Sequence, residues 1–274
     1  MSLRVLKKLK GRYHSIESLI TFCDLHDVIS ICKIRALKDK ISFSGKFRNG
    51  INKKSNTITK VLYFLRKRYF LRKQYFKINI QKNIPHGSGL GGGSSNAANL
   101  LKFINSTMRL KLNKAKMHKI ANQVGFDTPL SLEKKNTLLT GKKNKILRLK
   151  QKFGLNVLIV YPNVICSTHK MYKNNKKFNF SMAKSYFNIK NKKKLIFILK
   201  MEKNDLEEVV IKFYPEVKKV IDFIKIQNGC HFSRITGSGS ACIGVFSNMK
   251  TAILTQKLIK LKFPKYWTAV SKTI

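Results

Sequence analysis

The feature of this chain that most constrains its fold is a glycine-rich stretch at residues 85–96, Pro-His-Gly-Ser-Gly-Leu-Gly-Gly-Gly-Ser-Ser-Asn. Five of the seven residues from 87 to 93 are glycine, so the backbone can adopt left-handed conformations and approach a ligand closely. Residues 76–81, just before it, alternate apolar and polar side chains, which is typical of a strand. The residues after it predict an amphipathic helix from Ser94, with apolar side chains at helical spacing: Ala97, Leu100, Leu101 and Ile104.

A glycine-rich loop that ends where a helix begins presents free N–H groups and the positive end of the helix dipole to an anion. Ser94 and Ser95 add hydroxyls that can cap the helix, bind phosphate oxygens or reach Mg²⁺. No Gly-Lys-Ser/Thr closes the stretch, so it is not a Walker A loop. It contains GxGxxG, but no acidic residue follows about 20 residues later, as a dinucleotide site would need. A flexible linker is the alternative, but strand and helix patterns rarely flank a linker this closely.

The remaining sequence mixes short strand and helix patterns without a regular alternation, which favours an α+β fold over a doubly wound sheet. We expect one domain over residues 1–150 and a second over residues 151–274. Residues 173–194 are rich in lysine and asparagine and predict a mobile surface segment. The expected strands are 3–6, 16–22, 28–32, 41–44, 76–81, 155–161, 232–236, 241–246 and 267–270. The expected helices, besides the one after the glycines, are 57–68, 113–124, 206–213, 217–224 and 249–261.

The chain carries 57 basic and 12 acidic residues among 274, a formal charge of +45. Such a charge is expected of a nucleic-acid-binding protein, which is one alternative. However, only ten of the basic residues are arginine, whose planar fork suits base recognition, and the lysines are spread along the whole chain. Lysine, isoleucine, asparagine and phenylalanine share A/T-rich codons, so coding bias is the favoured explanation. We therefore expect no specific nucleic-acid partner, although a weak, salt-sensitive affinity for RNA can remain.

The sequence contains no run of about 18 apolar residues, so no membrane span is expected. The basic first residues are not followed by an apolar segment, which argues against a signal peptide. The five cysteines are scattered without the spacing of metal ligands, as is typical of reduced thiols in the cytoplasm. We therefore expect a cytoplasmic protein that is a monomer or a homodimer.

Because acids are scarce, carboxylate chemistry has few candidates. Asp127 lies in a turn after the helix predicted at residues 113–124 and just before Thr128-Pro129. A carboxylate there could accept the proton of a hydroxyl during phosphoryl transfer. An ordinary turn or cap residue is the alternative. Asp24 and Asp27 are expected only to shape a turn.

The glycine-rich stretch resembles the phosphate loop of the GHMP kinases, which phosphorylate small molecules such as homoserine and mevalonate. Three further segments are similar to motifs of that family and stand in the same order: residues 12–18, which contain a Tyr-His pair, residues 125–129 with Asp127, and residues 236–242, Thr-Gly-Ser-Gly-Ser-Ala-Cys. The resemblance covers nearly the whole chain. It implies a two-domain fold, with a ribosomal-protein-S5-like N-terminal domain and a ferredoxin-like C-terminal domain, and an ATP-dependent kinase that uses Mg²⁺.

The resemblance also implies roles for individual residues. Asp127 is expected to be catalytic, Ser94 or Ser95 to touch Mg²⁺, and the turn Thr236, Gly237, Ser238 and Gly239 to position phosphates and acceptor. For that turn a plain hairpin is the alternative, and nearby Arg234 is expected to pair with phosphate or to face solvent. The residues expected to bind ATP are Pro85, Gly87, Gly89, Leu90, Gly91, Gly92, Gly93, Ser94, Ser95, Asn96 and Asn56.

The Tyr-His pair resembles the branch of the family whose acceptor is an alcohol joined to cytidine diphosphate. In that branch Tyr13 would stack on the cytosine, His14 would hydrogen-bond its edge, and Tyr172 would cover the opposite side. Core packing is the alternative for each of these aromatic residues. A GHMP kinase with another acceptor, such as homoserine or a mevalonate derivative, also stays open. So does a basic RNA-binding protein without enzymatic activity, although no RRM, KH or OB signature is present.

The family's first strand carries an Ala-Lys-x-Asn segment just before the residues that match Ser2-Leu3-Arg4-Val5. The printed chain begins inside that strand. Its lysine would help to stabilise the transferring phosphoryl group. We therefore expect the chain as printed to bind ATP but to turn over slowly.

Overall fold

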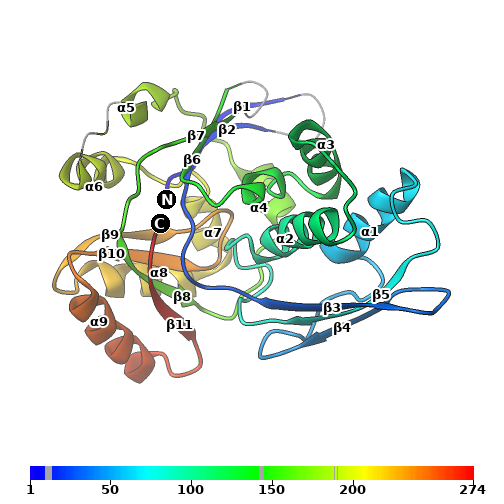
Figure 1. Cartoon of the computed structure of the whole chain (residues 1–274). Helices are drawn as coiled ribbons and strands as arrows, with labels where there is room; N and C mark the ends of the chain where they lie inside the picture. The colour runs from blue at the N-terminus through cyan, green and yellow to red at the C-terminus, as the bar shows by residue number, and fades with distance from the viewer. Residues whose placement is uncertain (10–13, 142–144, 188, 190) are drawn as a thin grey trace. The chain divides into compact units, whose positions relative to one another are not determined.

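A computed structural model describes residues 1–9, 14–141, 145–187, 189 and 191–274 of the chain. The described residues form helices and three β-sheets, which confirms the expected α+β class (Figure 1). They divide into two compact units. The first unit comprises Met1–Asp24, Gly87–Leu90 and Lys135–Ile274, and the second comprises Leu25–His86 and Gly91–Lys134.

The second unit is built on a three-stranded sheet of order β3-β5-β4. Its central strand, β5 (Tyr75–Gln81), pairs antiparallel with β3 (Val28–Ile34) and parallel with β4 (Lys40–Ser44). Three helices, α1 (Thr57–Lys67), α2 (Gly92–Thr107) and α3 (Lys114–Val124), share one hydrophobic core with the sheet. Fully buried members of this core are Leu62, Leu65, Ile78, Ile80, Leu100, Leu101 and Ile104.

Two of these helices begin at asparagine caps. The side chain of Asn56 accepts hydrogen bonds from the backbone N–H groups of Ile58 and Thr59. In return, the Asn56 backbone N–H donates to Thr59 Oγ1. Asn113 caps α3 in the same way, through Lys116 N. After α3, a turn leads into a 3-10 helix, η1 (Pro129–Leu132), which starts at a proline. These caps satisfy N–H groups that a helix cannot satisfy internally, so they fix where the helices start.

The first unit contains two antiparallel sheets. One has the order β1-β2-β6-β7 and consists of β1 (Arg4–Lys8), β2 (His14–Ile20), β6 (Thr137–Thr140) and β7 (Lys145–Arg148). The other has the order β11-β8-β10-β9 and consists of β8 (Asn156–Tyr161), β9 (Cys230–Ile235), β10 (Cys242–Phe246) and β11 (Trp267–Lys272). The sequence analysis did not predict β6 and β7, which are only four residues long.

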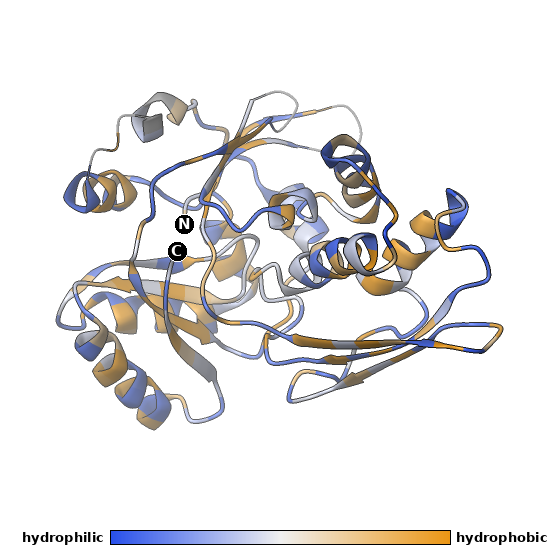
Figure 2. Cartoon of the chain, in the orientation of Figure 1, coloured by the Kyte–Doolittle hydropathy of each residue, from blue (hydrophilic) through white to orange (hydrophobic). Residues whose placement is uncertain are grey.

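Three helices share a core with one face of the second of these sheets: α7 (Glu207–Phe213), α8 (Pro215–Lys225) and α9 (Met249–Lys262). The strands β8 and β10 are buried along their whole length. Figure 2 shows the consequence, since these strands are mostly hydrophobic, whereas α9 carries both hydrophobic and hydrophilic residues. A continuous apolar strand is the pattern expected when a sheet is covered, whereas apolar side chains of α9 lie on its exposed as well as its buried side.

Residues 173–194, predicted to be a mobile surface segment, are mostly exposed where they are described, and their mobility stays a prediction. The structure has α4 (Thr168–Asn174), α5 (Ala183–Phe187) and α6 (Lys192–Met201) in or next to it. Tyr186 is only 1% exposed, and its hydroxyl hydrogen-bonds to Ser2 Oγ at 2.9 Å. Tyr186 and Ile189 are buried apolar side chains in this lysine- and asparagine-rich stretch, which the composition alone did not predict.

No helix in the described part of the chain is long and apolar enough to cross a membrane. The two units each combine segments from different parts of the chain, so they do not test the domain boundary expected near residue 150. That boundary stays a prediction.

Candidate active site

The helix that follows the glycine-rich loop begins at Gly92, two residues earlier than predicted. Its N-cap, Gly91, has a left-handed backbone with φ of 71°, and no side chain caps the helix. A left-handed turn at this point favours glycine, because a side chain there is strained. The first turn therefore offers backbone N–H groups, not a side-chain cap, to whatever binds in front of α2.

The two predicted Mg²⁺ contacts, Ser94 and Ser95, lie in the first turn of α2 and are half-buried. Hydroxyl oxygens suit a hard cation that also binds phosphate oxygens. The described residues contain no group of three or more His, Cys, Asp or Glu side chains that could hold a metal by themselves.

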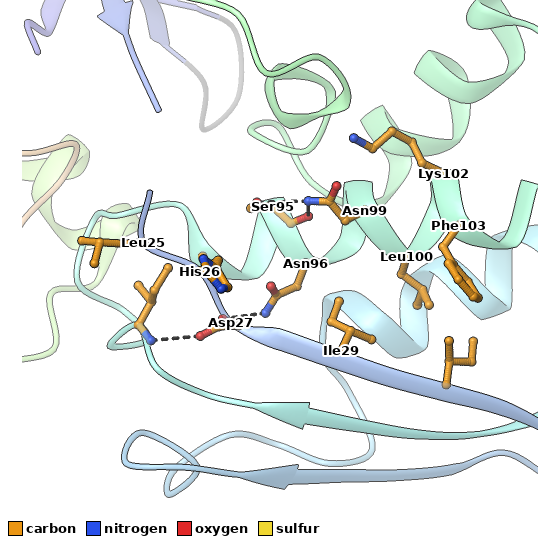
Figure 3. Close-up of a pocket in the computed structure, with 13 residues that line it drawn as sticks. Leu25, His26, Asp27, Ile29, Ser95, Asn96, Asn99, Leu100, Lys102 and Phe103 are labelled. Atoms are coloured by element: carbon orange, nitrogen blue, oxygen red, sulfur yellow. Dashed lines mark hydrogen bonds between the residues drawn. The ribbon is translucent and has the colours of Figure 1, made fainter. Parts of the chain in front are cut away.

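A buried carboxylate connects the two segments that flank the loop. The Asp27 side chain is 0% exposed and pairs with the Lys82 ammonium, whose side chain is 4% exposed. Asp27 also accepts hydrogen bonds from Asn83 N at 2.8 Å, Ile84 N at 2.9 Å and Asn96 Nδ2 at 2.8 Å. Figure 3 shows Asn96 pointing from α2 toward Asp27. The expectation that Asp27 only shapes a turn missed this role, and it missed Lys82 altogether.

Asn56, predicted to bind ATP, is used as the cap of α1. Its Nδ2 group donates to the backbone oxygens of Asn52 and Lys53, so both ends of the amide have protein partners. The next residue, Thr57, donates from Oγ1 to Gly93 O at 2.9 Å. The start of α1 is therefore bonded to the first turn of α2, and a direct contact of Asn56 with ATP stays a prediction.

A cavity of about 400 Å³ lies along α2 and β3 in the second unit (Figure 3). Its polar lining comes from Asp27, Ser95, Asn96, Asn99 and Lys102, and desolvation lowers the pKa of the Lys102 ammonium. Its apolar lining comes from Ile29, Ile31, Ile84, Leu100 and Phe103. A cavity of this size with mixed walls is in the range of small-molecule sites.

Asp127, the predicted catalytic residue, lies in the turn between α3 and η1. Thr128 N donates to Gly125 O at 3.1 Å and closes this turn. The Asp127 carboxylate is exposed, and it has no hydrogen bond or ion pair with other described residues. Desolvation by surrounding atoms nevertheless raises its pKa above the ordinary value. A carboxylate that is accessible and more basic than usual is suited to accept a proton from a hydroxyl.

In the first unit, loop residues Gly87–Leu90 pack against the turn between β9 and β10. Ala241 N donates to Ser88 O at 3.0 Å. A Cβ atom at Gly89, which has φ of 80°, would lie 2.3 Å from Thr236 O. The structure thus brings together two motifs that are about 150 residues apart in the sequence. Only glycine fits at position 89.

The turn itself is fixed by three side chains. Asn204 Nδ2 donates to Gly237 O at 2.8 Å, and Thr168 Oγ1 forms a 2.8 Å hydrogen bond with Ser238 Oγ. Ser240 Oγ donates to Val164 O. Thr168 and Asn204 were not predicted, because these contacts join distant parts of the chain and neither residue lies in a motif.

Arg234 does not face solvent, so that expectation for it is wrong, whereas its pairing with phosphate stays a prediction. The residue is 5% exposed, and its Nη2 donates to Leu199 O at 2.6 Å. Its guanidinium also lies 4.1 Å from the centre of the Phe232 ring. Desolvation lowers the pKa of Arg234 to about 10. It is a buried structural residue of β9.

Two of the three predicted cytosine contacts are neighbours in the first unit. The rings of His14, at the start of β2, and Tyr172, on α4, stack with centroids 5.1 Å apart and planes 29° apart. Desolvation and the nearby Lys8 ammonium lower the pKa of His14, which favours the neutral imidazole. Tyr13, the third, lies outside the described residues.

Comparison with known families agrees with this fold. Residues 56–134 match the family described as GHMP kinases N terminal domain, and residues 187–261 match GHMP kinases C terminal. The first match contains the start of α2 and Asp127, and the second contains the turn between β9 and β10. The class of protein is therefore an ATP-dependent small-molecule kinase of the GHMP fold.

Individual relatives narrow the class. A 4-diphosphocytidyl-2-C-methyl-D-erythritol kinase from Pelagibacter ubique is 36% identical over 97% of this chain and 92% of the relative. The chain belongs to the 4-diphosphocytidyl-2-C-methyl-D-erythritol kinase family.

Solved structures support the fold. A crystal structure of 4-(cytidine 5'-diphospho)-2C-methyl-D-erythritol kinase aligns with a TM-score of 0.74 and 19% identity, covering 99% of this chain and 95% of the other. Homoserine kinase from Cytophaga hutchinsonii aligns with a TM-score of 0.69 and 17% identity, over 93% and 88%. Because kinases with different acceptors share the fold, the fold alone does not select the acceptor.

Proposed function

We propose that this chain transfers the γ-phosphate of ATP to the 2-hydroxyl of 4-diphosphocytidyl-2-C-methyl-D-erythritol. This step belongs to the non-mevalonate route to isoprenoid precursors. The name of the Pelagibacter relative supports this acceptor, since its similarity extends over 97% of the chain. The observation that carries the proposal is the paired His14 and Tyr172 rings in the first unit.

Cytosine has an aromatic face and a polar edge, so its recognition needs a stacking partner and a hydrogen-bonding partner. Tyr172 supplies an aromatic face, and the neutral ring of His14 supplies one donor and one acceptor nitrogen. We propose that the base enters beside these rings, with Tyr13 as the further stacking residue. An acceptor without a nucleobase, such as homoserine, would leave these groups without a partner.

For ATP, we propose that the phosphates bind along the glycine-rich loop up to the first turn of α2. The free N–H groups after Gly91 and the helix dipole support this placement. Ser94 and Ser95 would contact Mg²⁺, which neutralises charge on the phosphates when bound. The turn Thr236–Gly239 would position the acceptor.

Asp127 is proposed to accept the proton of the acceptor hydroxyl as that hydroxyl attacks the γ-phosphate. The exposure and raised pKa of its carboxylate support this role. Phosphoryl transfer depends mainly on position and charge, so one placed carboxylate is sufficient for the proton.

The proposal extends to compartment and partners only in outline. All five cysteines are free thiols, which supports a reducing compartment such as the cytoplasm. The partner is a small molecule, and the high positive charge is proposed to have no specific nucleic-acid target.

The experiment is an assay of ADP release with Mg-ATP and three separate acceptors: 4-diphosphocytidyl-2-C-methyl-D-erythritol, homoserine and mevalonate. It compares the wild-type chain with Asp127→Asn. We expect turnover of the cytidyl acceptor alone, which is lost in Asp127→Asn. Phosphorylation of homoserine or mevalonate instead would overturn the proposed acceptor while leaving the kinase class intact.

A further inference from the structure

We infer that Asp27, together with Lys82 and Asn96, is a positioning cluster that sets the phosphate-binding end of α2 and thereby the affinity for ATP. The inference rests on the proposed function, because it assumes that ATP phosphates bind at this end of the helix. It assigns a positioning role to Asp27 and Lys82, and it gives Asn96, which is also expected to bind ATP, a second role through its bond to Asp27.

Asp27 connects the segment before the glycine-rich stretch to the helix after it. One Asp27 oxygen accepts from the backbone N–H groups of Asn83 and Ile84, which lead into the glycine-rich loop. The other oxygen accepts from the Lys82 ammonium and from Asn96 Nδ2, in the second turn of α2. A single carboxylate thus fixes the chain just before the glycines to the helix just after them. Glycines supply little rigidity of their own, so these bonds help to fix the two ends of the glycine-rich stretch.

The cluster also places a paired charge at the start of α2. A Cβ atom built on Gly92 would lie 3.6 Å from Lys82 Nζ, so the ammonium lies beside the first residue of α2. This end of the helix already carries partial positive charge, so a bare ammonium there would be unfavourable. Asp27 compensates that charge, and the pair is almost completely removed from water. When phosphates bind, their negative charge meets both the helix end and this ammonium.

Both carboxylate oxygens of Asp27 are hydrogen-bonded. Burying a carboxylate is costly unless it is paired and hydrogen-bonded. Asp27 meets that condition with one ion pair and three N–H donors. Such a fully bonded group holds its partners in one geometry, which is what a preorganised anion site requires.

The same unit offers a matched control in Asp39. It also immediately precedes a strand, it pairs with a cation, Arg66, at 2.6 Å, and it accepts from a backbone N–H, that of Phe76, at 2.9 Å. Asp39 bonds to the start of β5 through Phe76 N, whereas Asp27 bonds to residues just after the end of β5. The two carboxylates therefore have similar structural roles, but only Asp27 is bonded to α2.

The test compares Asp27→Asn with Asp39→Asn by ATP affinity from titration calorimetry, KM for the acceptor, and Tm. An amide at 27 would turn its NH₂ group toward Lys82 or Asn96, which breaks a charged hydrogen bond. We expect ATP binding about tenfold weaker or more in Asp27→Asn. KM for the acceptor should change less than about twofold, and in Asp39→Asn ATP affinity should stay within about twofold of wild type, although both variants lower Tm.

Asn96→Ala is the second variant, in case Asp27→Asn does not fold. It removes only the bond to α2 and leaves the ion pair intact, and we expect ATP binding about three- to tenfold weaker. Wild-type ATP affinity in both Asp27→Asn and Asn96→Ala, or equal losses in Asp27→Asn and Asp39→Asn, would overturn the inference. If wild type binds ATP but does not phosphorylate the cytidyl acceptor, the proposed acceptor fails while the ATP comparison still decides the cluster. If wild type does not bind ATP at all, both fail.

Discussion

The two regions that carry the proposed functional residues are held in different ways. In the first unit, the turn at residues 236–239 is fixed by neutral groups, Asn204 and Thr168, and the imidazole of His14 stacks on Tyr172. In the second unit, the start of α2 is fixed by the charged pair of Asp27 and Lys82, and Asp127 presents an exposed carboxylate.

This difference corresponds to the chemistry proposed for each region. In the second unit, charged side chains and helix N–H groups are proposed to bind the phosphates and accept the proton. Their electrostatic interactions are strong when the groups are fixed and partly removed from water. A neutral base is recognised by shape, stacking and neutral hydrogen bonds. The comparison therefore predicts that substitutions in the second unit act on ATP and kcat, whereas those in the first act on the acceptor.

The largest effect is expected from Asp127→Asn. Removing the group that accepts the hydroxyl proton should lower kcat by about 10²–10⁴-fold. KM for ATP should change little, and Tm should be unchanged or slightly higher, because the folded state already disfavours the charged carboxylate. Steady-state kinetics and thermal unfolding measure these quantities. A kcat within tenfold of wild type would remove Asp127 from the proton-transfer role.

Gly89→Ala should have the next largest effect, and Gly91→Ala is its control. Both glycines have a positive φ, but only at Gly89 would a Cβ meet a backbone oxygen, at 2.3 Å, whereas Gly91 has open space. We expect Gly89→Ala to lower the free energy of unfolding by at least about 2 kcal/mol, and Gly91→Ala by only about 1 kcal/mol. Urea unfolding of both variants checks this. Equal losses would mean that the packing of the loop against Thr236 is not restrictive.

Tyr172→Ala tests the neutral region directly. Loss of one stacking ring should raise KM for the cytidyl acceptor about tenfold, with KM for ATP unchanged. Tyr172→Phe keeps the ring and should behave like wild type, which separates stacking from the hydroxyl. An unchanged acceptor KM in Tyr172→Ala would place cytosine recognition elsewhere.

The pH dependence of activity should follow Asp127 in the second unit and not His14 in the first. Asp127 must be ionised to accept a proton, so activity falls as the pH drops through its pKa, which is raised above the ordinary value of 3.8. The acid limb of kcat/KM should therefore lie above the pH expected for an ordinary aspartate. His14→Gln should leave this limb in place, because the lowered pKa keeps His14 neutral over most of the range. A limb that disappears in His14→Gln would contradict the assignment.

The smallest predicted effect is a change in stability from removing a neutral hydroxyl in the second unit. Thr128, next to Asp127, is 0% exposed, and its Oγ1 has no hydrogen-bond partner among the described residues. Thr128→Val keeps the shape and removes the unsatisfied hydroxyl, so we expect the unfolding free energy to rise by about 1–2 kcal/mol. Thr137→Val is the control, because that hydroxyl donates to Lys135 O at 2.7 Å and its loss should be destabilising. A destabilised Thr128→Val would indicate that the hydroxyl has a partner after all.

Local patterns predicted the loop region well. The alternation before the glycines became β5, and the helical spacing after them became α2. The helix starts before Ser94 because Gly91 provides a left-handed N-cap, a feature of backbone geometry that side-chain spacing does not report. The motif around Asp127 correctly placed that residue in a turn after a helix.

Long-range contacts were not predictable in this way. Asp27 resembled an ordinary turn residue because its partners Lys82 and Asn96 are 55 and 69 residues away. Arg234 was expected to pair with phosphate or to face solvent, but its Nη2 donates to the carbonyl of Leu199. Neither contact leaves a periodicity in the sequence.

The most direct test of the account is two-substrate kinetics on wild type, Asp27→Asn and Tyr172→Ala, with ATP and 4-diphosphocytidyl-2-C-methyl-D-erythritol varied independently. The account predicts that Asp27→Asn raises KM for ATP alone and Tyr172→Ala raises KM for the acceptor alone, each about tenfold. If each variant raised both constants equally, or if wild type did not use this acceptor, the proposed division between a charged nucleotide region and a neutral base region would be contradicted.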